Sequence, residues 1–145
     1  MRFMIIRKAD PDTEAEKPPA PGLFDAMMAY NDELIKAGVM VDGMGLMPSS
    51  YGARIEFEDG KPNITDGPFT EVRELIAGFT LIEVGSKEEA IEWVKRWPVE
   101  DGGGNVRLEL RQVLTIDDFG DAVNDEQRAH YDEQVKAVQE LHDNG

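Results

Sequence analysis

The order of strand-like and helix-like segments constrains the fold of this chain more than any other feature. Four segments have the apolar runs or the alternating apolar and polar residues that are typical of β-strands, and two have apolar residues at helical spacing. The strand-like segments are 2–7, 39–50, 77–84 and 106–113. With the helical segments placed between them, the order β-α-β-β-α-β predicts an α+β fold, with a ferredoxin-like sheet and both helices on one face.

Both helices carry recognisable start or stop signals. The first, 23–37, is followed by Gly38, which is typical of a helix C-terminus. The second opens at Ser86, the first residue of a capping box, and Pro98 ends it. Apolar residues recur on one side of the first helix, at Leu23, Met27, Tyr30 and Leu34.

Two insertions interrupt this order. ARIEFEDGKPNI (53–64) alternates cleanly and has Asp59-Gly60 at its turn, so it predicts an inserted hairpin. KADPDTEAEKPPAPG (8–22) has four prolines and alternating charges, which argue against a helix or a central strand. We expect a long loop there, acting as a lid or simply mobile.

A further helix follows the last strand. Asn124-x-x-Gln127 is a capping signal, and an apolar stripe follows at Tyr131, Val135, Val138 and Leu141. The sequence therefore predicts a domain over 1–122 and a helical extension over 123–145. The apolar stripe of this extension must pack on the body of the protein or on a partner subunit.

The charge and the composition exclude several classes of function. The formal net charge is −15, which would repel a polyanion, so we expect no direct nucleic-acid binding. No window holds the roughly 18 consecutive apolar residues of a membrane span. The N-terminal apolar run is too short for a signal peptide, so the cytoplasm is the expected location. With no cysteine and no phosphate-loop or EF-hand pattern, we expect neither a metal nor a cofactor.

Charged residues near the DGPF turn (66–69) and on the later strands are the candidate site. Carboxylates can act as acid or base and arginines can bind anions, provided that both face a pocket. The catalytic candidates are Asp66, Glu71 and Glu83. The ligand-binding candidates are Arg54, Asp66, Arg73, Glu83, Glu109 and Arg111. The alternative for each is structural: a turn-bonding aspartate, exposed ion pairs, or a paired network within the sheet.

The blocks 45-GLMPSS-50, 53-ARIEFEDGKP-62, 66-DGPFTEVRELIAGF-79 and 89-EAIEWVKRWP-98 resemble the YCII-related proteins of the DGPF type. The likeness extends over roughly residues 2–122. It implies a dimeric α/β barrel, in which the sheets of two subunits face each other around a shared interior. The family has no generally established reaction, and some members are encoded beside or fused to extracytoplasmic-function sigma factors.

Two departures from the family pattern bear on function. Broader YCII-like proteins are discussed as enzymes because of a histidine–aspartate pair, whereas both histidines here, His130 and His142, lie in the C-terminal helix. The strand end that is often Glu-x-Arg-Pro reads 109-ELRQ-112. The first departure argues against histidine-based catalysis, and the second affects a strand end.

These observations leave open whether the protein is an enzyme. The favoured hypothesis is a non-catalytic small-molecule-binding or regulatory protein, associated with sigma-factor-dependent transcription. The alternative is a cofactor-independent enzyme of the dimeric-barrel type that acts on a small organic acid. The expected partners are a second copy of the chain, a small anionic organic ligand and a regulatory protein.

Overall fold

The computed structural model describes residues 1–144 and divides the chain into two compact units, Met1–Val113 and Leu114–Gly145. The first unit holds the expected sheet, the two helices that cover it and the inserted hairpin. The second holds the C-terminal helix.

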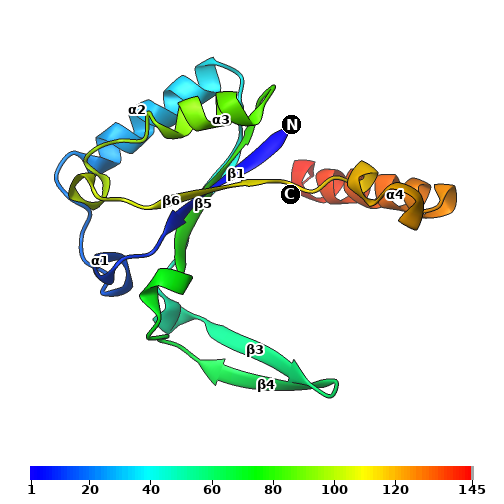
Figure 1. Cartoon of the computed structure of the whole chain (residues 1–145), viewed down its shortest axis with the longest axis horizontal. Coiled ribbons are helices and arrows are strands. Elements are labelled where there is room, and N and C mark those ends of the chain that lie inside the picture. The colour runs from blue at the N-terminus through cyan, green and yellow to red at the C-terminus, as the bar shows by residue number, and fades with distance from the viewer. Residues whose placement is uncertain (145) are drawn as a thin grey trace. The chain divides into compact units, whose positions relative to one another are not determined.

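The first unit is built on a four-stranded antiparallel sheet of order β2-β5-β1-β6. Its strands are β1 (Arg2–Lys8), β2 (Met40–Gly45), β5 (Ile76–Glu83) and β6 (Leu108–Gln112). The helices α2 (Leu23–Lys36) and α3 (Lys87–Val94) lie on the same side of this sheet (Figure 1). The order and the one-sided helices confirm the predicted ferredoxin-like β-α-β-β-α-β fold.

The main core lies between the two helices and the sheet. Alternation along β1 points Phe3 and Ile5 toward the helices, and Ile82 of β5 and Leu34 of α2 meet them there, all four buried. Burying one such side chain contributes about 1.5–3 kcal/mol. Gly38 ends α2 with a φ of 74°, and the amide of Val39 donates to the carbonyl of Leu34, as the sequence predicts for a helix end.

The segment 8–22 differs from its prediction, because it contains one helical turn, α1 (Pro11–Glu14). Asp10 caps this turn: its side chain accepts from the Thr13 amide, and the Thr13 hydroxyl accepts from the Asp10 amide. Pro11 is at the helix start, where a missing N–H costs nothing. The expectation of no helix was wrong because these start signals outweigh the number of prolines.

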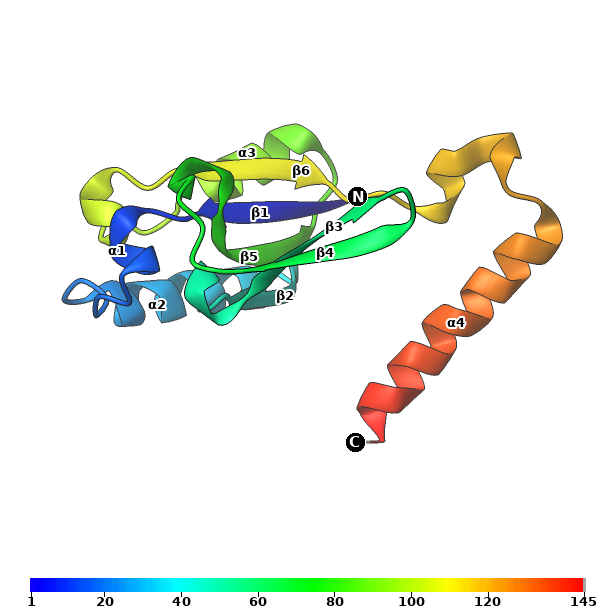
Figure 2. The ribbon, with the colours of Figure 1, turned by 90° about the horizontal axis from the view of Figure 1, so that it is seen from below.

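The inserted hairpin forms as expected, from β3 (Ala53–Glu58) and β4 (Lys61–Asp66), and is a separate two-stranded ribbon. It projects on the side of the sheet away from the helices (Figure 2). Asp59 and Gly60 both have positive φ, 49° and 78°, as a tight hairpin turn requires. Ile55, Phe57 and Ile64 leave an apolar surface exposed on this ribbon.

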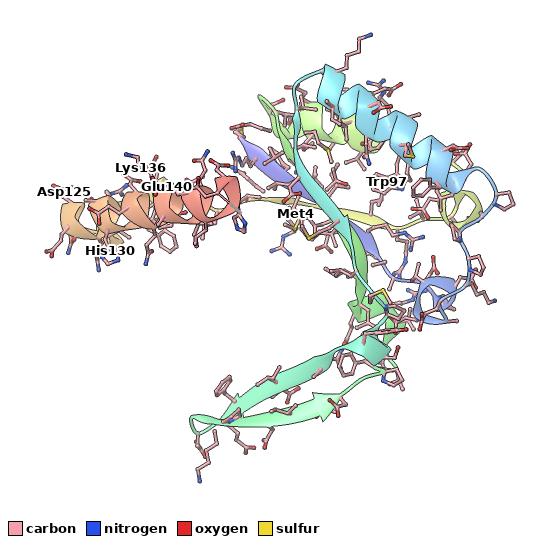
Figure 3. The ribbon with its side chains drawn as sticks, turned by 180° about the vertical axis from the view of Figure 1, so that it is seen from behind. Met4, Trp97, Asp125, His130, Lys136 and Glu140 are labelled. Carbon is pink, nitrogen blue, oxygen red and sulfur yellow. The ribbon has the colours of Figure 1, made fainter. Side chains whose placement is uncertain are left out.

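The sheet face away from the helices has an apolar centre with no cover inside the first unit. The register places Met4 beside Leu81, and Ile6 beside Phe79, and all four side chains are half-buried. Figure 3 shows Met4 on this side and Trp97 in the layer between the sheet and α2. We call the surface formed by Met4, Ile6, Phe79 and Leu81 the open face.

The second unit consists of a short turn, η4 (Ile116–Ala122), and α4 (Asp125–Asp143). The predicted capping box forms, because the side chains of Asn124 and Gln127 each accept from the other's amide. Arg128 joins the two elements through Asp117, at 2.8 Å, and the Gly120 carbonyl. Within residues 1–144, no helix is long and apolar enough to cross a membrane.

Candidate functional site

A cavity of about 710 Å³ lies in the first unit, between α2 and the helix-covered face of the sheet. Its walls are mainly apolar. They are formed by Leu23, Met27, Met40 and Trp97, among others. Glycines of β2 and β5 (Gly43, Gly45 and Gly78) also line it, and their missing side chains leave the strands open to the cavity.

Arg7 and Asp101 are the charged residues of the cavity wall. Arg7 follows Phe3 and Ile5 on the same side of β1, so its guanidinium enters the layer between sheet and helices. Asp101 lies in the turn η3 (Asp101–Gly104) that follows α3. The Arg7 Nη2 lies 2.6 Å from Asp101 Oδ1, and the Nε lies 3.1 Å from Oδ2. This fork holds the guanidinium in one orientation.

The other side of the guanidinium is also occupied. The Arg7 Nη1 donates to the Lys8 carbonyl at 2.7 Å and to Asp10 Oδ2 at 2.9 Å. Burial by itself would lower the pKa of Arg7, but hydrogen bonds and charge attraction from Asp101 and Asp10 raise it above its ordinary value. Burial would raise the pKa of Asp10, but hydrogen bonds from the Thr13 amide and from Arg7 lower it. One cation therefore faces two carboxylates.

Trp97 joins this network through its indole. The Trp97 Nε1 donates to Asp101 Oδ2 at 2.9 Å, and its ring meets the Tyr30 ring edge-on, with 5.4 Å between centroids. The Tyr30 hydroxyl donates to the Trp93 carbonyl at 2.8 Å, and burial raises the pKa of Tyr30 to about 12.

Asn31 contributes an unusual group. It follows Leu23 and Met27 at four-residue spacing on α2, so its side chain reaches the cavity wall. Among residues 1–144, its Oδ1 is the buried side-chain oxygen or nitrogen that lacks a hydrogen-bond partner. Leaving a buried acceptor unpaired costs about 1–3 kcal/mol, so a site with this feature suits a ligand that donates a hydrogen bond there.

The α1 segment forms another part of the wall, through Thr13 and Pro19. It is anchored by Glu14, whose carboxylate accepts from the amide and the hydroxyl of Ser49 in η1 (Ser49–Tyr51). The Tyr51 hydroxyl donates to Glu16 at 3.0 Å. These bonds hold the start of the 8–22 segment in place beside the cavity.

The DGPF turn also contacts Ser49 of η1. The Phe69 amide donates to Ser49 Oγ at 3.0 Å, and the Arg54 guanidinium lies 4.1 Å from the centre of the Phe69 ring. A Cβ at Gly67 would lie 1.8 Å from the Ser49 carbonyl oxygen, so only glycine permits this approach. The motif therefore fixes the turn against η1.

The residues predicted as a site fall into two groups. Glu83, Glu109 and Arg111 lie beside the apolar centre of the open face, where the register pairs Met4 with Arg111 and Ile6 with Glu109. Arg111 Nη1 is 3.4 Å from Glu109 Oε2, and Glu83 is 3.9 Å from an Arg2 nitrogen, all well exposed.

The second group lies at the base of the hairpin. Asp66 ends β4, Glu71 and Arg73 follow in the η2 region (Val72–Glu74), and all three are exposed. Arg54 makes a long contact of 3.9 Å with Glu74. In the part of the chain that the structure describes, the lining of the cavity includes neither group, and their roles stay predictions.

Sequence reasoning missed Arg7, Asn31 and Asp101. Two of them leave a signal: Arg7 continues the buried side of β1, and Asn31 continues the apolar spacing of α2. Asp101 sits in a glycine-rich turn whose sequence gives no sign of a buried partner. Across residues 1–144, no three histidine, aspartate or glutamate side chains group in a way that could hold a metal ion.

The fold and the cavity define a ferredoxin-like α+β protein with a pocket between its helices and its sheet. The sequence model of the YCII-related domain matches residues 1–117, and the chain belongs to this family. An uncharacterised protein of Rhizobium meliloti (strain 1021) is 29% identical over 69 residues, which are 48% of this chain. The match spans 56% of that relative's length.

A solved structure with a similar outline is the 5-chloro-2-hydroxyhydroquinone dehydrochlorinase TftG of Burkholderia phenoliruptrix AC1100, in complex with 2,5-dihydroxybenzoquinone. It is 18% identical, with a TM-score of 0.43. The likeness covers 79% of this chain and 94% of that one.

Proposed function

We propose that this protein binds a small organic molecule in the cavity between α2 and the sheet, and that it does so as a homodimer. The observation that carries the proposal is an apolar cavity of about 710 Å³ whose wall includes Asn31, a residue with a buried and unpaired Oδ1. Ligand sites are typically clefts of roughly 300–1,000 Å³ with apolar walls and a few placed polar groups.

The polar groups of the cavity favour binding over catalysis. Three hydrogen bonds, two from Arg7 and one from Trp97, already use three of the roughly four lone-pair sites of the Asp101 carboxylate, and the carboxylate is ion-paired with Arg7. A catalytic base needs a free lone pair within reach of the proton that it removes. Arg7, with its raised pKa, stays charged and cannot act as an acid. These groups therefore shape and orient a pocket.

The open face supports the homodimer. Its centre is apolar, and an antiparallel sheet with one face on the core leaves its other face either polar or covered by a partner. A second subunit would cover Met4, Ile6, Phe79 and Leu81. The hairpin projects on the same side of the sheet and adds further exposed apolar side chains to such an interface (Figure 2).

The second candidate function is a cofactor-independent enzyme that acts on a small organic acid. The observation in its favour is that Glu83, Glu109 and Arg111 share the open face. A facing subunit would bring two such sets into one interior, where an arginine could bind a carboxylate and a glutamate could transfer a proton.

A regulatory role, with a protein partner linked to sigma-factor-dependent transcription, rests on the second unit. Along α4 the side chains of Val135, Val138 and Leu141 are at least half exposed. Such a stripe on an acidic helix suits a protein partner with an apolar groove.

Filling the cavity tests the main proposal. Gly45 lines the cavity, and a Cβ there would come no closer than 3.9 Å to another atom, so Gly45→Leu should fill the space without a backbone clash. Ala53→Leu adds similar bulk at an exposed position of β3 and is the control.

A small-molecule fragment library is screened against the wild type, Gly45→Leu and Ala53→Leu by ligand-observed NMR. We expect fragments that bind the wild type and Ala53→Leu but not Gly45→Leu. Equal binding to all three would contradict the assignment.

A further inference from the structure

We infer that the cavity selects uncharged or cationic molecules that donate a hydrogen bond, and that it disfavours organic anions. This inference rests on the proposed function, because it names the ligand class of the same cavity. It differs from the anionic ligand that the arginine-rich candidate set predicted.

The charges around the cavity give the first argument. Arg7 carries one positive charge, and the carboxylates of Asp101 and Asp10 both touch its guanidinium, so the group of three has a net charge of −1. Four hydrogen bonds already use the Nε, Nη1 and Nη2 atoms of Arg7. A guanidinium has five N–H groups, so little remains to bind a ligand carboxylate. An anion would meet an arginine whose charge is already more than balanced.

Asn31 gives the second argument. Its Oδ1 can only accept, and it is buried without a partner. A ligand N–H or O–H would pair it, whereas a carboxylate or an ether would leave it unpaired. One unpaired buried group typically changes affinity by about tenfold or more. A ligand with a donor is therefore favoured over the same molecule without one.

The walls give the third argument. Met27 and Met40 line the site with flexible thioethers, and Trp97 adds aromatic surface. Methionine adapts to different shapes and makes favourable contacts with aromatic rings. The ligand class is therefore a molecule with an apolar, preferably aromatic, body that carries a donor group.

Matched probes separate charge from hydrogen bonding. On an indole scaffold these are indole, which has an N–H donor, 1-methylindole, which lacks it, the cation tryptamine and the anion indole-3-acetate. The corresponding uncharged donor, methylated donor, cation and anion are also tested on benzene and naphthalene scaffolds. Dissociation constants are measured by ligand-observed NMR on the full chain. We expect methylation of the donor to weaken binding at least about tenfold. We expect each anion to bind at least about tenfold more weakly than its cationic partner.

The outcomes distinguish this inference from the proposed function. If anions bind more tightly than cations and Gly45→Leu abolishes that binding, the cavity is a ligand site but the inferred class is wrong. If no probe on any scaffold binds, the inference and the proposed function both fail. Anion binding that survives Gly45→Leu but is lost in Arg111→Ala would place the ligand on the open face, and this also overturns the inference.

A variant of Asn31 supplies a second readout. Asn31→Leu removes the acceptor, so indole and 1-methylindole should then bind within about twofold of each other. Without ligand, this variant should melt at a higher temperature than the wild type, because a buried unpaired oxygen is replaced by an apolar side chain. Asn63→Leu, at an exposed position of β4, is the control and should leave the tenfold preference for indole over 1-methylindole unchanged. If Asn31→Leu still prefers indole tenfold, Asn31 is not the group that accepts the ligand's hydrogen bond.

Discussion

Arg7 and Asp101 lie 94 positions apart in the sequence and form a two-pronged ion pair in the wall of the cavity. Their side chains are 11% and 8% exposed. The pair joins the first strand to the turn after α3, and Trp97 and Asp10 complete its hydrogen bonds. The same contacts hold one wall of the cavity and connect distant parts of the fold, so the site and the stability of the first unit depend on each other.

Breaking this pair should be costly. Asp101→Asn keeps the shape of the side chain but leaves the Arg7 charge without its main partner, and breaking a buried pair costs about 3–5 kcal/mol. Glu109→Gln breaks the exposed pair with Arg111, which should cost less than about 1 kcal/mol. Urea denaturation at pH 7 measures both free energies of unfolding. Similar losses in the two variants would show that the Arg7 pair is not effectively buried.

Tyr30 should make the protein sensitive to alkali. Its pKa is raised from 10.0 to about 12, so the folded state holds the phenol proton more tightly than the unfolded state. This contribution to stability is complete below pH 10 and is lost as the pH rises through about 12. Tyr30→Phe should cost about 1 kcal/mol at pH 8, because the bond to the Trp93 carbonyl is lost.

The measurement is the free energy of unfolding in urea between pH 8 and 11.5. The curve of Tyr30→Phe should fall less steeply with pH than that of the wild type above pH 10. Tyr131→Phe removes an exposed phenol on α4 and is the control. Parallel curves for the wild type and Tyr30→Phe would mean that Tyr30 ionises as easily in the folded state as in the unfolded one.

The sequence predicted the strands and helices of the first unit well because their signals are local. Apolar strand-forming runs indicate β1 and β5, alternation indicates β6, and single residues such as Gly38 and Ser86 mark helix ends where the structure has them. The α1 turn was missed, although Asp10 and Thr13 have the spacing of a cap. There the count of prolines was given more weight than the capping chemistry, which a proline at the helix start leaves intact.

The site was harder to predict because its contacts join distant segments. Arg7 lies on the same side of β1 as Phe3 and Ile5, which shows that a charged group enters the core. No local pattern shows that Asp101 is its ion-pair partner. Exposed charges on strands, such as Glu109 and Arg111, look the same in sequence as charges inside a pocket. A periodic pattern gives the side of an element on which a residue lies. It does not give the element that faces it.

The close approach at the DGPF turn gives a third prediction. A Cβ at Gly67 would overlap the Ser49 carbonyl oxygen, so Gly67→Ala must move the turn away from η1. Overpacking of this kind costs about 1–3 kcal/mol. Gly52→Ala is the control, since its Cβ would lie 3.7 Å from that oxygen, in ordinary contact. Thermal and urea denaturation should show Gly67→Ala destabilised and Gly52→Ala nearly unchanged. Equal stability of the two would show that the turn adjusts freely.

The open face gives the last prediction. If two subunits associate through it, Leu81→Glu places a carboxylate in the apolar centre of the interface, next to Met4, and the dimer should dissociate. A stable interface buries about 800 Å² on each subunit, and a charge without a partner in its middle removes much of that gain. Ile35→Glu is the matched control, because Ile35 is equally apolar but lies 62% exposed on α2, away from the open face.

Sedimentation equilibrium at micromolar concentration should give a dimer for the wild type and Ile35→Glu and a monomer for Leu81→Glu. The melting temperature of each variant shows whether it is folded. A folded Leu81→Glu dimer, or a monomeric wild type, would contradict association through this face.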